Sequence, residues 1–269
     1  MRLVLTAFSA MAVALAISLP GCVKPGGSEI LVSSKIAESE QELITGGGTW
    51  VVLGDSLTGD NPKSHMKRYY DYVAEDLGCT VVNKGEGGTG YKSPGWSASF
   101  YDRAKTMDLD GVDCLTIFGS FNDLGKGYDL GTANDETLDT IGGCMNLTIK
   151  ELIHKAPTVR IGIVTPTPWK TNLAFNAEGE ALENGTSREE CNEYVRLLKK
   201  VANKYRLPIL DLYETCGFNP DDQQVREVLY ATGGEIDQNG VHPGEEGHRF
   251  MYPAWREFVK TLMPSVRGE

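Results

Sequence analysis

Four short segments of this chain hold residue types that acyl transfer requires. Ser56 follows the apolar run Trp50–Leu53 and a glycine, so its hydroxyl can be exposed at a strand end as a nucleophile. Residues 83–90 form a glycine-rich loop whose backbone N–H groups can approach a ligand closely. Asn122 follows a later apolar run and can present its amide to an oxyanion. His242 lies in a loop before the last helical segment, where an imidazole can act as a general base.

Each of these features also has an ordinary structural explanation. A serine at such a turn can cap a helix, an asparagine can form an Asx turn, and a glycine-rich loop can simply be flexible. The same loop is one insertion away from a phosphate-binding motif, but Tyr91 occupies the position of the lysine and Lys92 follows one residue late. A nucleotide hydrolase is therefore a minor alternative.

The order of the four segments is a stronger signal than any one of them. Over about residues 49–263 the chain resembles the SGNH (GDSL) hydrolase family, and Gly54-Asp55-Ser56-Leu57 matches the GDSL string letter for letter. By this resemblance Gly88 corresponds to the glycine of the second block, Asn122 to the asparagine of the third and His242 to the histidine of the fifth.

The resemblance implies a definite set of roles. Ser56 would be the nucleophile, and His242 would be its base. The oxyanion hole would consist of the Ser56 N–H, the Gly88 N–H and the Asn122 side-chain amide. Two acids within the matched segments, Asp55 and Asp123, are expected to support the site.

The sequence departs from the family pattern in two places. The third block usually reads G-x-N-D, whereas two residues separate Gly119 from Asn122 here. The fifth block usually reads D-x-x-H, but Asn239 stands three residues before His242, and Asp237 stands five before it. Three arrangements stay open: Asp237 reaches the imidazole by a different loop path, Asn239 orients it without charge, or a Ser–His dyad works with a backbone carbonyl.

The resemblance implies ester hydrolysis through an acyl-enzyme, without a metal or an organic cofactor. Family members cleave acetylated sugars, lipids, thioesters and simple esters. Aromatic residues in the stretch 91–96 would suit a sugar ring if exposed, although core packing explains Trp96 equally well. We expect a carbohydrate O-acetyl esterase first and a lipase or lysophospholipase second. An inactive SGNH-fold module that binds a glycan is the alternative from another class, because position 239 lacks an acid.

The elements that must position these residues are predicted by hydrophobic periodicity. Short apolar runs alternate with longer segments of helical spacing, which predicts βα units in an α/β domain. We expect a three-layer α/β/α, flavodoxin-like domain with a central, mainly parallel five-stranded sheet, whose ligands bind at the carboxyl ends of the strands. The predicted strands are 50–53, 80–82, 112–118, 159–164 and 208–212, and the predicted helices are 65–77, 135–154, 187–205 and 245–263, with a potential interruption at Pro253.

Composition excludes some classes of partner and site. The 269 residues carry a formal net charge of −11, which argues against a nucleic-acid backbone as the main partner. The six cysteines include no CxxC pair, so neither a zinc site nor a redox motif is predicted. One disulfide is compatible with export, but its partners cannot be chosen. Cys114, inside an apolar run, is expected in the core.

The N-terminus predicts export. Residues 1–22 read as a signal peptide, and Leu19-Pro20-Gly21-Cys22 resembles a bacterial lipobox in which the cysteine is lipidated. Residues 23–48 are predicted to be a tether, 49–263 the hydrolase domain and 264–269 a tail. We expect an envelope protein anchored to the membrane at Cys22, or a secreted one, that acts on a small-molecule or glycan ester.

Overall fold

The computed structural model describes residues 47–59, 66–92, 94–170, 173–175 and 181–263. All of them fall within one compact unit, Leu43–Glu269. The predicted signal peptide, the lipid-anchor site, most of the tether and the C-terminal tail lie outside the described residues. The division into these four segments therefore stays a prediction.

The centre of the unit is a five-stranded sheet in which all neighbouring strands are parallel. The spatial order is β2-β1-β3-β4-β7. The order reverses at β1, and parallel sheets bind ligands at such switch points. The strands are β1 (Thr49–Gly54), β2 (Thr80–Gly85), β3 (Cys114–Phe118), β4 (Arg160–Val164) and β7 (Ile209–Leu210).

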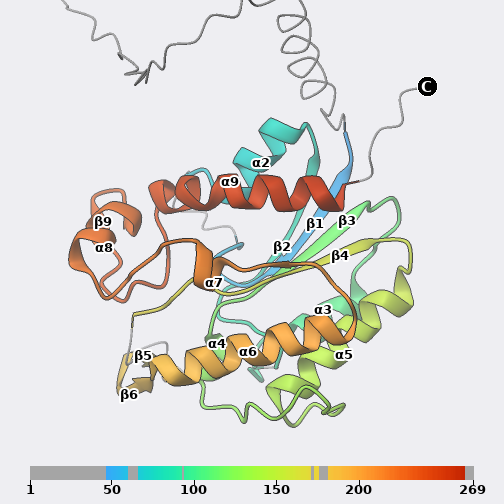
Figure 1. Cartoon of the computed structure of the whole chain (residues 1–269), viewed down its shortest axis with the longest axis horizontal. Coiled ribbons are helices and arrows are strands. Elements are labelled where there is room, and N and C mark those ends of the chain that lie inside the picture. The colour runs from blue at the N-terminus through green and yellow to red at the C-terminus, as the bar shows by residue number, and fades with distance from the viewer. Residues whose placement is uncertain (1–46, 60–65, 93, 171–172, 176–180, 264–269) are drawn as a thin grey trace, which may run out of the picture. The chain divides into compact units, whose positions relative to one another are not determined.

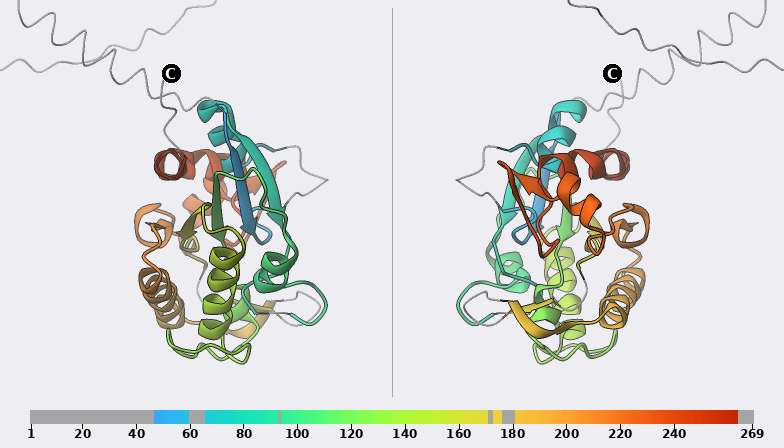
Figure 2. Two further views of the ribbon diagram at one scale, coloured as in Figure 1. Left: turned by 90° about the vertical axis from the view of Figure 1, so that its right-hand side faces the viewer. Right: turned by 90° about the vertical axis from the view of Figure 1, so that its left-hand side faces the viewer.

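Helices cover both faces of this sheet (Figure 1). On one face α2 (Tyr69–Leu77) packs against α9 (Glu245–Leu262). On the other face lie α3 (Phe100–Thr106), α5 (Ile141–Lys155) and α6 (Arg188–Lys204), and the views of Figure 2 show the same layers from the two sides. The predicted three-layer α/β/α class is confirmed.

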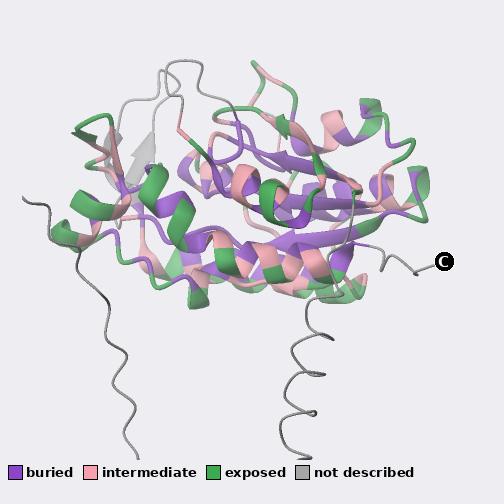
Figure 3. Ribbon diagram, turned by 90° about the horizontal axis from the view of Figure 1, so that it is seen from above, coloured by how far each residue is buried: buried purple, intermediate pink, exposed green. Residues whose placement is uncertain are grey.

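Successive side chains of a strand point to opposite faces of the sheet, so the strands contribute to two separate hydrophobic cores. In β1, Trp50 and Val52 pack under α2 and α9, whereas Val51 and Leu53 pack under the helices of the opposite face. All four side chains are fully buried, since a strand covered on both faces needs apolar residues at every position. Figure 3 shows the buried strands between helices that are exposed on their outer sides.

Local capping signals move some helix boundaries from their predicted places. The helix predicted over 135–154 begins only at Ile141, because the Thr140 hydroxyl caps it by accepting the Gly143 N–H. The helix predicted over 65–77 begins at Tyr69, and His65 lies outside the described residues. Pro253 lies inside α9 without ending it.

The strand predictions are confirmed in number and order within the main sheet, but not in every boundary. The fifth strand, predicted over 208–212, is only Ile209–Leu210, because Asp211 caps the short helix α7 (Leu212–Thr215) by accepting the Glu214 N–H. The third strand begins at Cys114 rather than at 112.

Several elements were not predicted from sequence. They are α3, α4 (Asn122–Gly125), α7, α8 (Gln223–Leu229), the β5–β6 pair (Leu173–Phe175 with Ala181–Thr186) and the β8–β9 pair (Ala231–Thr232 with Glu235–Ile236). None of these helices and strands is longer than seven residues, and a segment of that length shows a helical or alternating pattern only weakly.

No helix among the described residues is both long and apolar enough to cross a membrane. Cys114 is buried in the core as expected. Five cysteines of the described part of the chain are free thiols: Cys79, Cys114, Cys144, Cys191 and Cys216.

Candidate active site

Ser56 lies in a tight turn directly after β1, at the carboxyl edge of the sheet. The turn closes through hydrogen bonds from the N–H groups of Thr58 and Gly59 to the Asp55 carbonyl, at 3.1 and 2.7 Å. Gly54 makes this turn sterically feasible, because a Cβ there would stand 2.7 Å from the Thr58 Cβ and 2.8 Å from the Phe118 carbonyl oxygen. The close packing of β1 on β3 thus requires the glycine that precedes the serine.

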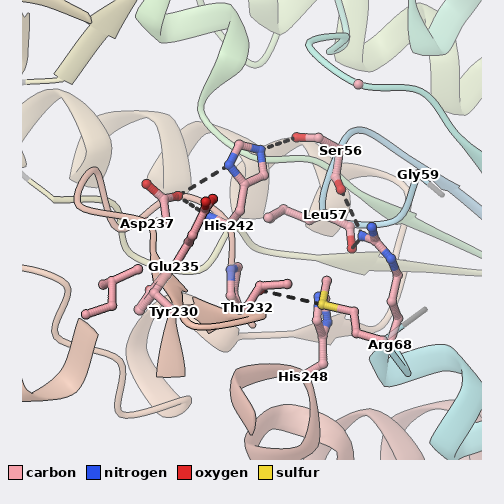
Figure 4. A pocket seen from close by; sticks show the side chains of 14 residues that line it. Ser56, Leu57, Gly59, Arg68, Tyr230, Thr232, Glu235, Asp237, His242 and His248 are labelled. Carbon is pink, nitrogen blue, oxygen red and sulfur yellow. Dashed lines mark hydrogen bonds and ion pairs between the residues drawn. The ribbon is translucent and has the colours of Figure 1, made fainter. Parts of the chain in front are cut away.

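Ser56 and His242 meet although 186 residues separate them in the chain. The Ser56 Oγ lies 2.9 Å from the His242 Nε2 (Figure 4). The His242 side chain is 56% exposed, so both the pair and its surroundings are open to solvent. This is the geometry in which an imidazole can take a serine proton.

Asp237 lies on the side of the His242 ring that faces away from Ser56. Its Oδ2 lies 3.3 Å from the His242 Nδ1. The loop winds around this carboxylate, which also accepts the backbone N–H of Val241 at 3.1 Å and of His242 at 2.7 Å. Burial alone would raise the pKa of Asp237, but the hydrogen bonds from His242 outweigh it and lower the pKa to about 2. Asp237 is therefore a carboxylate at neutral pH.

The structure also places Asn239, the other predicted partner of His242. Asn239 donates its backbone N–H to the Asp237 Oδ1 at 2.9 Å. Within the described loop, no contact joins the Asn239 side chain to the imidazole. Asp237 reaches His242 from five residues before it because the loop folds back, with the Gly240 N–H donating to the Asp237 carbonyl at 3.0 Å.

Asp55 is a fully buried carboxylate behind the nucleophile turn. Its Oδ1 accepts the Leu57 N–H at 2.9 Å, and its Oδ2 accepts the Ser120 N–H at 2.6 Å and the Asn122 Nδ2 at 3.1 Å. Burial raises the pKa of Asp55, although these hydrogen bonds oppose the rise. The side chain ties the segment after β1 to the segment after β3.

The three predicted oxyanion donors differ in whether their N–H groups already donate hydrogen bonds within the protein. Among the described residues, neither the Ser56 N–H nor the Gly88 N–H donates to a protein acceptor. The Asn122 amide, in contrast, donates to the Asp55 Oδ2 and to the Thr89 carbonyl at 2.9 Å, which occupies both of its hydrogens. Asn122 can reach an oxyanion only by giving up one of these bonds.

Gly88 is held in a left-handed conformation beside an exposed tryptophan. Its φ is +70°, and a Cβ at this position would come within 3.1 Å of the Trp96 ring. Lys126 fixes the peptide by donating to the Gly88 carbonyl at 2.8 Å. The preceding residue, Gly87, stands against Ser56. Trp96 is 60% exposed, so the core packing considered for it does not occur.

Asp123 supports the loops rather than the reacting groups. It is buried, and its carboxylate accepts the N–H groups of Tyr91 at 2.8 Å and Lys92 at 3.2 Å. Burial raises its pKa to about 7, although both N–H groups oppose the rise. The Lys92 Nζ donates to the carbonyls of Leu138 and Asp139, at 2.6 and 3.0 Å. The lysine that resembles the lysine of a phosphate-binding motif is therefore hydrogen-bonded to backbone carbonyls of another segment.

A cavity of about 610 Å³ opens beside Ser56, on the side of His242. The sequence motifs account for only part of its lining. Of these residues, His248 was expected only to pack, and it does stack on Tyr69 at a ring-centroid distance of 5.9 Å. Arg68 and the β8–β9 pair gave no motif that could have been recognised. The missed lining residues include Met66, Arg68, Tyr230, Thr232, Glu235, Ile236 and His248.

No group of three or more potential metal ligands of the His, Cys, Asp and Glu types occurs among the residues that the structure describes.

Comparisons with known proteins bear on the family and the fold of this chain. A profile of the GDSL-like Lipase/Acylhydrolase family matches residues 52–250, more than half of the chain. A search of curated proteins gave no match. Among solved structures, a Lactobacillus plantarum protein is similar at 21% identity and a TM-score of 0.66, covering 80% of this chain and 98% of that one.

Two enzymes with informative names share the fold at lower similarity. A lipase/acylhydrolase from Enterococcus faecalis is 18% identical with a TM-score of 0.53, over 82% of this chain and all of that one. An aryl esterase from M. smegmatis is 19% identical with a TM-score of 0.54, over 80% of this chain and all of that one. At such identities the structures show a common fold, while the profile shows the family. This protein belongs to the GDSL-like lipase/acylhydrolase family, a family of ester hydrolases.

Proposed function

We propose that this protein is a serine esterase in which Ser56, His242 and Asp237 form the catalytic triad. The single observation that carries the proposal is the chain of contacts from Ser56 Oγ to His242 Nε2 at 2.9 Å and from His242 Nδ1 to the Asp237 carboxylate at 3.3 Å. An ionised Asp237 holds the tautomer with its proton on Nδ1 and stabilises the imidazolium.

The mechanism has two halves. His242 takes the Ser56 proton as the oxygen attacks the ester carbonyl, and the carbonyl oxygen becomes an oxyanion. The N–H groups of Ser56 and Gly88 bind this oxyanion, and Asn122 joins them by exchanging its bond to Asp55 or Thr89. His242 then gives its proton to the leaving alcohol. Water, activated by the same imidazole, hydrolyses the acyl-enzyme, and no cofactor takes part.

We infer a carbohydrate O-acetyl ester as the substrate. Trp96 supports this choice, because its exposed indole ring stands against Gly88 at the edge of the site. Indole rings are large, rigid apolar surfaces, and the C–H face of a sugar ring can pack on them. The open surroundings of His242 also suit a glycan that extends beyond the site.

The reason for considering an inactive glycan-binding module was the missing acid three residues before His242. Asp237 supplies a carboxylate at that place from a different position in the loop. A catalytic triad therefore fits this loop better than an inactive glycan-binding module.

Labelling with a fluorophosphonate probe tests the triad. The wild-type protein should be labelled rapidly, Ser56→Ala not at all and His242→Ala much more slowly, because the probe reacts only with an activated serine. Circular dichroism of each variant serves as the control for folding. Absence of labelling in the folded wild-type protein would exclude the proposed triad.

A further inference from the structure

Arg68 is the cation closest to the nucleophile turn on the side of the cavity. Its side chain belongs to the cavity lining, and the residue is 6% exposed. The Nη1 donates to the carbonyl of Ser56 at 3.0 Å and of Leu57 at 3.3 Å. These two bonds use one nitrogen of the guanidinium, which has five N–H donors in all. The rest of the group remains available to a ligand in the cavity.

This buried charge has no counter-ion among the described residues. Asp71 accepts only the backbone N–H of Arg68, at 2.8 Å. Within the described segments, no carboxylate forms an ion pair with the guanidinium. Glu235 also lines the cavity, but Figure 4 shows it on the opposite side, near Asp237. A buried cation without an anionic partner is costly, and an anion brought by a ligand would remove part of that cost.

A second polar side chain of the same cavity, that of His248, lacks a hydrogen-bond partner within the described part of the chain. His248 is fully buried, lines the cavity, and neither of its ring nitrogens has a hydrogen-bond partner among the described residues. Native structures rarely leave buried polar atoms unsatisfied unless water or a ligand binds them. The imidazole and the guanidinium thus share one cavity. Its other lining residues include the apolar Leu57, Met66, Ile236 and Pro243 and the polar Thr232, Glu235, Asp237 and His242.

The position of His242 decides which half of an ester the cavity receives. His242 must return its proton to the leaving oxygen, so the alcohol lies on the histidine side of Ser56. His242 and Asp237 both line the cavity, whereas Gly88 and Asn122 do not. The alcohol half of the substrate therefore enters the cavity, and the acyl half lies toward the candidate oxyanion donors.

We propose that Arg68 is a specificity-determining residue that binds a carboxylate on the alcohol half of the substrate, so that the preferred substrates are esters of acidic alcohols such as sugars bearing a carboxylate. This inference rests on the proposed esterase function and narrows its substrate class. A guanidinium pairs with a carboxylate through parallel hydrogen bonds, which gives orientation as well as affinity.

A pair of acetate esters that differ only in charge tests the proposal. The probes are 4-acetoxybenzoate and 4-acetoxybenzamide, which share the acetyl group, the ring and nearly the same size. The measured quantity is the ratio of kcat/KM for the benzoate to that for the benzamide. Any intrinsic difference in reactivity between the two esters cancels when this ratio is compared between variants.

Arg68→Gln should lower the ratio about tenfold or more, because a hydrogen-bonded charge pair with the substrate is lost. Arg68→Lys keeps the charge and should retain most of the ratio. Glu235→Gln should raise the ratio, because it removes a carboxylate that repels the anionic ester. Raising the ionic strength should reduce the wild-type ratio.

Arg103→Gln is the matched control. Arg103 also holds a backbone carbonyl of the first strand, that of Gly54 at 3.0 Å, but it does not line the cavity. Loss of the Arg103 side chain should change kcat/KM for the two esters by the same factor. If Arg68→Gln behaves in the same way, with both esters slowed equally and the ratio unchanged, Arg68 only holds the turn and the proposal is wrong.

Binding of the product-like ligands separates this proposal from the esterase function. If the wild-type protein hydrolyses neither ester, the proposed function fails, and calorimetry with 4-hydroxybenzoate and 4-hydroxybenzamide then decides about Arg68. Tighter binding of the benzoate, lost in Arg68→Gln, would support the anion site. Equal binding of the two ligands would overturn it.

Discussion

At the scale of single residues, the Asp237 carboxylate is the group on which the site most depends. It accepts three backbone N–H groups from its own loop and faces the His242 Nδ1. The same side chain therefore shapes the loop and orients the imidazole. Asn239 takes part only through its backbone, which any residue can supply.

The two loop residues should differ sharply when replaced. Asp237→Asn should lower kcat by about 10²–10⁴, because a neutral amide stabilises the imidazolium poorly and can favour the wrong tautomer. Asn239→Ala should leave kcat nearly unchanged. Steady-state kinetics with an aryl acetate measure both. A larger loss in Asn239→Ala than in Asp237→Asn would mean that the contact seen here is not the catalytic one.

Trp96 offers a second test at the same scale. Trp96→Ala should lower kcat/KM for an O-acetylated oligosaccharide by about fivefold or more, corresponding to about 1 kcal/mol of lost packing. The rate with a small aryl acetate should change little, since no sugar ring is present to stack. Trp96→Phe is the matched variant and should recover part of the loss. Equal losses on both substrates would contradict a role in sugar binding.

At the scale of elements, the loops that follow β1, β2 and β3 meet at the site, and the loop between β9 and α9 adds Asp237 and His242. Asp55 ties the loop after β1 to Ser120 in the loop after β3. Asp123, at the start of α4, ties that region to the N–H groups of Tyr91 and Lys92 in the segment after β2. Both carboxyl groups are buried, so the contacts between loops depend on polar groups without access to water.

The elevated pKa of Asp123 predicts how this junction responds to pH. The pKa of Asp123 is about 7 in the folded protein and close to the ordinary aspartate value of 3.8 in the unfolded chain. Between these values the folded state holds a proton that the unfolded state has released. The contribution of Asp123 to the free energy of unfolding is therefore largest below about pH 4 and declines as the pH rises to 7.

Comparison with Asp123→Asn isolates this effect from other titrations. The variant should be less stable than the wild type near pH 4, by about 1–3 kcal/mol, because an amide cannot accept both N–H groups. The difference in free energy of unfolding between the wild type and the variant should become smaller as the pH approaches 7. Urea unfolding at several pH values measures it. A gap that widens over this range would show that Asp123 is ionised throughout.

At the scale of the whole molecule, every group of the proposed mechanism lies within residues 47–263. The predicted lipid anchor at Cys22 lies outside the described residues, at the other end of a predicted tether. Attachment to a membrane and ester hydrolysis should therefore be separable properties. The described part of the chain places no reacting group near its first strand residue, Thr49, at the amino edge of the sheet.

Cys22→Ser tests this separation in a bacterial host. The wild-type protein should appear in the membrane fraction and the variant in the soluble one, because a lipidated N-terminal cysteine is no longer formed. The value of kcat/KM for a soluble aryl acetate should be the same for both. Membrane association that survives the substitution would refute the lipid anchor, and a changed kcat/KM would refute the independence of the two properties.

Much of this protein could be predicted from sequence because the relevant signals are local. Apolar runs such as 50–53 are buried strands wherever both faces of a sheet are covered, and their alternation with helical segments determines a parallel sheet. The GDSL string, the glycine-rich loop and His242 could be recognised for the same reason, since each is a short motif at a strand end or before a helix.

Only the tertiary structure decided the rest, because it depends on groups far apart in sequence. Spacing alone left Asp237 and Asn239 as alternatives, and the contact of His242 with the Asp237 carboxylate, on which the proposed triad rests, arises from a loop that folds back around that carboxylate. Asn122 carries the expected side chain, yet its hydrogen bonds are set by Asp55 and Thr89. Arg68 and His248 belong to no motif, and they share a cavity because α2 and α9 pack side by side. Side-chain direction and burial arise from such packing, and no local pattern encodes them.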